Sequence, residues 1–114
     1  MITFKKLLER AKTKQIAVHT PTEEQAITLL KMLDKMGFTW CDGDKLTTKT
    51  YYGDEKENTC YSFHKFYGKL RAKDIMYSPL DWFQSFGYKI IEFSEIDFEE
   101  EKTKWHQNYH SANY

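Results

Sequence analysis

The sequence has few of the residues from which disulfide frameworks and thiolate metal sites are built. Its 114 residues contain only two cysteines, Cys41 and Cys60, and no CxxC pair. We therefore expect two reduced thiols, with a disulfide or a metal pair completed by histidine as the alternative. No metal site and no cofactor is predicted.

The chain also lacks an excess of charge of either sign. Its 17 basic residues balance its 17 acidic residues. A strong non-specific nucleic-acid binder carries a large positive excess, because phosphate neutralisation supplies most of its affinity. A protein that imitates DNA over its whole surface would instead be strongly acidic. Neither class fits this chain.

Long hydrophobic runs are missing as well. No stretch approaches the roughly 20 apolar residues of a membrane span, and the first residues lack the apolar run of a signal peptide. We expect a cytoplasmic protein that makes no contact with a membrane.

Motifs for catalysis are absent from the sequence too. It contains no GxSxG, no HExxH and no glycine-rich phosphate loop. Asp54, Glu55 and Glu57 are neighbours only in sequence, on a segment we expect to be an exposed loop. The histidines have no nucleophile at a recognisable spacing, so we expect a protein that is not an enzyme.

What the sequence does contain is a strand, helix and strand between Gln15 and Trp40. Thr20 is the expected N-cap, followed by Pro21 at the first helical position and by Glu23 where a capping box needs it. Gly37 ends the helix, because glycine takes the left-handed conformation without strain. His19 lies at the end of the first strand, where we expect a hydrogen-bonded structural residue or, alternatively, a ligand-binding one.

Together these patterns predict an α+β fold with one mixed or mainly antiparallel sheet of four or five strands. Within it, residues 16–18 and 38–40 are expected to lie side by side under a helix face made of leucines. Residues 1–98 form the predicted domain and residues 99–114 a polar tail. The expected strands cover residues 15–19, 38–41, 59–63, 70–73 and 88–93, and the expected helices cover residues 3–13, 21–36 and 79–86.

Three segments of the chain resemble a set of small bacteriophage proteins of Gram-positive hosts. They read AVHTPTEEQAITLLKMLDKMGFTW, ENTCYSF and GYKIIEFSEI, and the likeness spans residues 12–97. The resemblance implies a phage origin and carries no catalytic motif. By analogy it implies a counter-defence factor acting in the cytoplasm of the infected host.

Two kinds of binding site follow from the aromatic residues. Stacked aromatic rings beside lysine and arginine are what a sponge for a cyclic-nucleotide immune signal needs. Tyr51 and Tyr52 next to Lys49 supply one such set. The turn after residue 63 supplies the other, with Tyr67, Lys69 and Arg71.

The second kind of site is a surface that blocks a host defence protein such as a CRISPR nuclease. Protein interfaces favour tryptophan, tyrosine, phenylalanine and methionine. On a helix from Pro79, we expect Leu80, Phe83 and Phe86 to face the core and Trp82 to face outward. We favour this inhibitor over the nucleotide sponge, and a homo-oligomer stays open.

Overall fold

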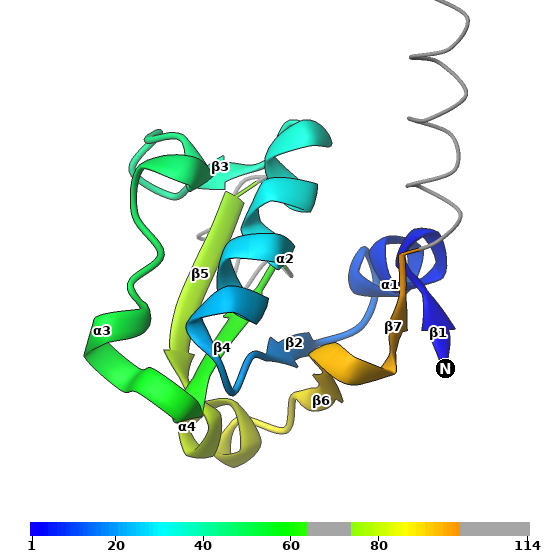
Figure 1. The fold of residues 1–114 in the computed structure, drawn as a ribbon. Coiled ribbons are helices and arrows are strands. Elements are labelled where there is room, and N and C mark those ends of the chain that lie inside the picture. The colour runs from blue at the N-terminus through cyan, green and yellow to red at the C-terminus, as the bar shows by residue number, and fades with distance from the viewer. Residues whose placement is uncertain (64–73, 99–114) are drawn as a thin grey trace, which may run out of the picture.

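A five-stranded mixed sheet forms the centre of the computed structural model, which describes residues 1–63 and 74–98 (Figure 1). The central strand, β4, runs antiparallel to both of its neighbours, so the other four strands all point the same way. In sheet order the strands are β3 (Thr39–Trp40), β5 (Asp74–Pro79), β4 (Thr59–Ser62), β2 (Ile16–His19) and β6 (Lys89–Glu92).

The remaining elements pack around this sheet. A two-stranded parallel ladder joins the first strand to the last one described. The elements are β1 (Ile2–Thr3), β7 (Ile96–Asp97), the helices α1 (Phe4–Ala11), α2 (Glu23–Lys35), α3 (Tyr52–Glu55) and α4 (Leu80–Ser85), and the 3-10 turns η1 (Leu46–Thr48), η2 (Lys56–Asn58) and η3 (Phe93–Glu95).

The predicted α+β class with one mixed sheet is confirmed. The strand expected at residues 70–73 lies outside the described residues, and the next described strand, β5, begins at Asp74. The short strands β1 and β7 were not predicted. The segment expected to be an exposed loop after Tyr52 is helical, because α3 and η2 follow each other there.

One prediction about the sheet is wrong. Residues 16–18 and 38–40 do not lie side by side, because β4 and β5 separate β2 from β3. The chain after α2 crosses over both strands, and β3 pairs in parallel with the first residues of β5. Local patterning identifies a strand, but it does not identify the strand's neighbour. That choice depends here on Ile75, which lies opposite Trp40.

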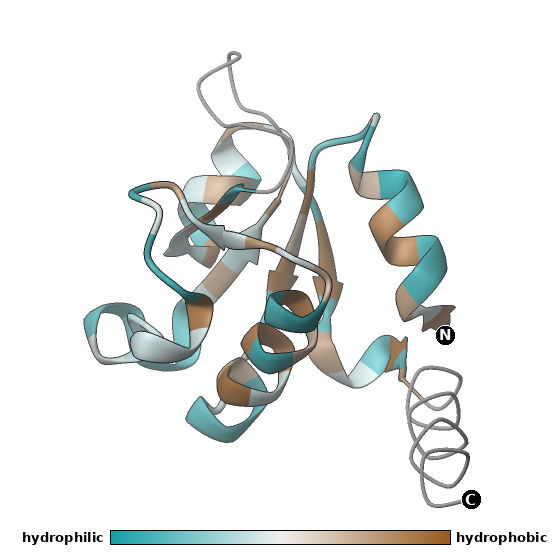
Figure 2. Ribbon diagram, turned by 90° about the horizontal axis from the view of Figure 1, so that it is seen from above, coloured by the Kyte–Doolittle hydropathy of each residue, from teal (hydrophilic) through white to brown (hydrophobic). Residues whose placement is uncertain are grey.

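The alternation of side chains along β2 divides the core into two faces. Ile16 and Val18 belong to the large cluster under α2, whereas Ala17 belongs to a smaller cluster under α4. Successive residues of a strand point to opposite faces, so the two helices cover opposite faces of the sheet. The expected leucine face of α2 is confirmed, since Leu29, Leu30 and Leu33 are all buried. Figure 2 shows hydrophobic colour on the central strands and both colours along the helices that cover them.

The sheet contains two β-α-β units of the same design. One is β2, α2 and β3, and the other is β5, α4 and β6. Each unit starts on a strand beside β4 and ends on an outer strand of the sheet. Because the helices lie on opposite faces, a half-turn about the direction of β4 would exchange the two units.

The two helices also end in the same way. The amide of Phe38 donates to the carbonyl of Leu33, and the amide of Tyr88 donates to that of Phe83. A glycine precedes each donor residue, Gly37 with φ 88° and Gly87 with φ 79°. Both glycines take the left-handed conformation that this Schellman motif needs. The stop predicted at Gly37 is therefore confirmed, and Gly87 repeats it at the end of α4.

The starts of these helices differ from the prediction. Thr22, not Thr20, is the N-cap of α2, and its capping-box partner is Gln25 instead of Glu23. The hydroxyl of Thr20 is buried and donates to the carbonyl of Thr59 at 3.2 Å, so it ties α2 to β4. In α4 the N-cap position is Pro79, whose side chain has no acceptor and makes no cap bond, and Ser78 lies one residue earlier in β5.

Helix α1 packs against the two-stranded ladder at the end of the molecule opposite β3 (Figure 1). Its apolar stripe is buried at Phe4, Leu7 and Ala11, and Thr3 is its N-cap, within the helix expected at residues 3–13. The ring of Phe4 lies 5.2 Å from that of Phe98, centroid to centroid. Phe98, the last residue that the structure describes, therefore belongs to the main core.

Candidate functional site

Tyr51 lies in an aromatic cluster and is not an open platform. Its ring stacks on Tyr77 with centroids 4.2 Å apart and planes inclined by 11°. Trp40 meets the same ring edge-on at 4.8 Å, and the Lys49 ammonium lies over it at 5.0 Å from the centroid. These contacts occupy the ring surface that a nucleotide base would need, so Tyr51 serves the fold.

Tyr52 is likewise engaged inside the molecule. Its hydroxyl donates to the carbonyl of Pro21 at 2.7 Å, and its ring packs half-buried against the main core. The sequence predicted both tyrosines as binding residues, and the structure shows them holding the segment of residues 50–55 in place.

Lys49, the cation of the predicted nucleotide site, is already surrounded by anions. Its Nζ lies 3.4 Å from Asp42 and 3.2 Å from Asp44 in the turn after β3. The pKa of Lys49 is raised, first by its hydrogen bond to the Tyr51 side chain and then by Asp44. Asp42 in turn accepts from the Asp44 amide, which lowers the Asp42 pKa. A phosphate would have to displace these carboxylates.

The other predicted cationic site cannot be placed. Tyr67, Lys69 and Arg71 lie outside the described residues. The described strands on either side of these residues, β4 and β5, pair antiparallel, with Ser62 opposite Met76.

Trp82 is the predicted binding residue that reaches the surface. It is half-buried on α4, and its ring lies 4.5 Å from that of Phe86, centroid to centroid. The prediction that Phe86 faces the core is wrong, since 41% of it is exposed. The reason is that α4 ends at Ser85, so Phe86 is the C-cap and turns away from the sheet. Only Phe83 of this helix is fully buried.

We call the surface around these two rings the α4 aromatic patch. Its members are the apolar residues on and beside α4 that are exposed or half-buried: Met76, Leu80, Trp82, Phe86 and Ile90. They rest on the smaller core cluster, in which Phe83 meets Tyr88 at 4.9 Å. The patch is therefore a rigidly supported, aromatic surface.

A row of three potentially catalytic residues crosses the sheet beneath the other end of α4. His19 lies opposite Cys60 on one side and opposite Glu92 on the other. Burial raises the pKa of the Cys60 thiol to about 12, so it remains protonated at neutral pH and is a poor nucleophile. Both cysteines are free thiols, and Cys41 is exposed. The His19 ring, as described below, is bound on both nitrogens.

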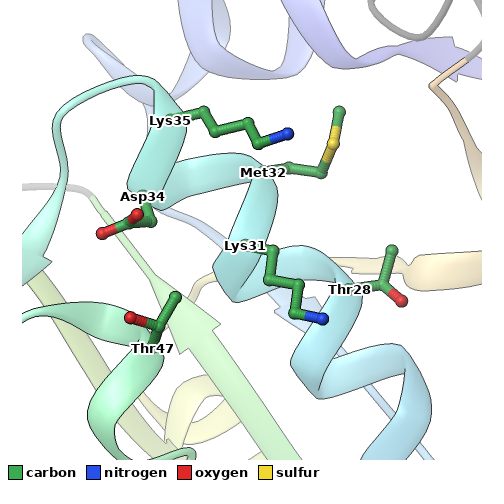
Figure 3. A pocket seen from close by; sticks show the side chains of 6 residues that line it. All are labelled: Thr28, Lys31, Met32, Asp34, Lys35 and Thr47. Carbon is green, nitrogen blue, oxygen red and sulfur yellow. The ribbon is translucent and has the colours of Figure 1, made fainter.

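A shallow groove lies between α2 and η1 (Figure 3). It encloses about 260 Å³ and is lined by Thr28, Lys31, Met32, Asp34, Lys35 and Thr47. In Figure 3 the side chains of Lys31 and Lys35 extend along the helix, and Thr47 faces Asp34 across the gap. The groove is open, and the surface it exposes is mainly the apolar part of these side chains, so it is a weaker candidate than the α4 aromatic patch.

The described part of the chain has neither a metal-binding cluster nor a membrane-spanning helix. In residues 1–63 and 74–98, no three His, Cys, Asp or Glu side chains are grouped to hold a metal ion. No helix described here is long and apolar enough to cross a membrane.

Comparison with models of protein families, with curated proteins and with solved structures finds no match to this chain. The assignment of a function therefore depends on the surface of the molecule itself.

Proposed function

We propose that this protein acts by binding, without catalysis, and that it blocks a host defence protein through the α4 aromatic patch. The observation that carries the proposal is the Trp82–Phe86 pair, with ring centroids 4.5 Å apart and 41% of Phe86 exposed. Exposed phenylalanine beside tryptophan and methionine is the composition of an interface centre. The resemblance to phage proteins supplies the setting, the cytoplasm of an infected bacterium.

The arrangement of the tyrosines supports protein binding over nucleotide sequestration. A nucleotide sponge needs free aromatic faces and free cations, whereas Tyr51 is covered by Tyr77 and Lys49 is paired with two aspartates. Among the predicted binding residues that the structure describes, only Trp82 joins an apolar surface with an exposed ring. A CRISPR nuclease remains one example of a partner, and the contacting surface on it would be an apolar recess that accepts the two rings.

The experiment is affinity capture from host lysate with three full-length baits: the native chain and two variants. Phe86→Ser removes the exposed ring, and Met36→Ser is the matched control. Met36 is 39% exposed and is the C-cap of α2, just as Phe86 is the C-cap of α4. The native chain and the Met36 variant should retain one host protein. The Phe86 variant should bind it at least about tenfold more weakly, the loss expected for a hot-spot residue.

Two results would contradict the proposal. One is a captured protein that binds all three forms equally. The other is a chain that captures no protein but gains thermal stability with a cyclic nucleotide, by an amount that grows with ligand concentration. That second result would establish the nucleotide sponge instead.

A further inference from the structure

His19 joins three elements through one imidazole ring. From the end of β2, its Nδ1 lies 2.8 and 3.0 Å from the two carboxylate oxygens of Glu92 on β6. Its Nε2 lies 2.6 Å from the backbone carbonyl of Glu57 in η2. The ring is only 13% exposed, so water does little to replace these contacts.

Both partners of the ring are hydrogen-bond acceptors. A neutral imidazole carries one N–H, so it can satisfy the carboxylate or the carbonyl but not both. In the neutral ring a nitrogen lone pair would face an acceptor oxygen. With Glu92 as a carboxylate, both contacts are hydrogen bonds only when each ring nitrogen carries a proton. We infer that His19 is a proton-dependent latch that fastens the segment of residues 50–58 to the sheet.

This segment is held in a conformation that L-residues rarely adopt. Tyr51 has φ 58° and Lys56 has φ 51°, both in the region that favours glycine. Such strain persists only where surrounding contacts enforce it. Besides His19, three tyrosine hydroxyls hold the segment or anchor it: Tyr61 donates to the Thr50 carbonyl, Tyr52 to the Pro21 carbonyl and Tyr77 to Asp54.

Of these four attachments, the one through His19 depends on a ring that carries two protons. The hydrogen bond to Asp54 raises the pKa of Tyr77 to about 12, and burial raises that of Tyr61. The tyrosine hydroxyls therefore keep their protons. When the ring holds a single proton, that proton stays on Nδ1, because the Glu92 carboxylate is the stronger acceptor. The Glu57 carbonyl then has no donor on the ring.

The charged groups on the elements around the ring are mainly acidic. Cys60 on β4 is neutral. A cation, the exposed Lys56 in η2, directly precedes Glu57 in the sequence. The acidic groups are Glu92 on β6, Glu57 in η2, Glu23 and Glu24 in the first turn of α2, and Asp81 in the first turn of α4. The latch is closed while the ring carries a proton on each nitrogen, and it opens when one of these protons is lost.

The test is amide hydrogen exchange of the full chain, expressed as protection factors so that the intrinsic pH dependence is removed. The reporters are the amides of Asp54 and Lys56, which donate to Tyr51 and Tyr52. The controls are Gly37 and Phe38, in the turn at the end of α2. Between about pH 5.5 and about pH 8, the reporters should lose protection by roughly tenfold, while the controls change little.

The decisive variant is Glu92→Gln, in which the amide can donate to Nδ1. A neutral ring can then keep its single proton on Nε2 and donate to the Glu57 carbonyl at every pH. Reporter protection should therefore become independent of pH, whereas His19→Phe should show low protection at both pH values. The inference fails if the native chain shows no pH dependence, or if Glu92→Gln retains the native dependence. Glu92→Gln keeps the test decisive should the His19 variant fail to fold.

Discussion

The two β-α-β units share a design but differ in how well their helices cover the sheet. Helix α2 has 13 residues and buries Ala26, Leu29, Leu30, Met32 and Leu33. Helix α4 has six residues and buries Phe83 alone. A short helix cannot cover the apolar residues around it, so Trp82 and Phe86 remain at the surface. The comparison shows that one face of the sheet is well covered, whereas the other leaves exposed the aromatic surface that we propose for binding.

The largest difference is expected from truncation of a buried leucine. Leu30→Ala in α2 should lower the free energy of unfolding by about 2–5 kcal/mol, through lost burial and the cavity left behind. Leu80→Ala in α4 should cost less than half as much, because Leu80 is half-buried. Urea denaturation of both variants measures the two values. Equal losses would show that the α4 face is as important for stability as the α2 face.

The two glycine stops should, in contrast, behave alike. Gly37→Ala and Gly87→Ala should each cost about 1–2 kcal/mol, because a Cβ is unfavourable in the left-handed conformation. A Cβ built at either position meets no atom within 4 Å, so the cost is purely conformational. Thermal unfolding of the two variants provides the comparison. A marked difference between them would mean that the two helix ends are not equivalent.

The smallest effect concerns the helix starts. Thr22→Ala removes the N-cap bond to Gln25 and should lower the free energy of unfolding by about 1 kcal/mol. Ser78→Ala should change it by less than about 0.5 kcal/mol, because Ser78 does not cap α4. Chemical denaturation of the pair distinguishes the capped helix from the uncapped one. A larger loss for Ser78→Ala would reverse this assignment.

The parts of the fold that depend on local sequence could be predicted from it. The leucine spacing of α2, the cap of α1 and the glycine stops all depend on residues within a few positions of each other. The position of β3 in the sheet could not, because it depends on Ile75, 35 residues from Trp40 along the printed sequence. The pattern of Leu80, Phe83 and Phe86 was also too short to show that the helix ends before Phe86.

The candidate site was predicted less well than the fold. Trp82, predicted to face outward, is half-buried and packs against the smaller core cluster. Tyr51 was taken as a free platform, because the partner that covers it, Tyr77, is distant in sequence. The link between His19 and Glu92 spans 73 residues, so no spacing rule could reveal it. Contacts between side chains that are distant in sequence can be identified only from the structure.

The most direct test of the central claim is a hydrogen-exchange footprint of the complex with the captured host protein. If the α4 aromatic patch is the binding surface, amides of residues 80–88 should gain protection on binding, and those of residues 28–36 in α2 should remain unchanged. Protection confined to α2 and the groove beside η1 would contradict the account.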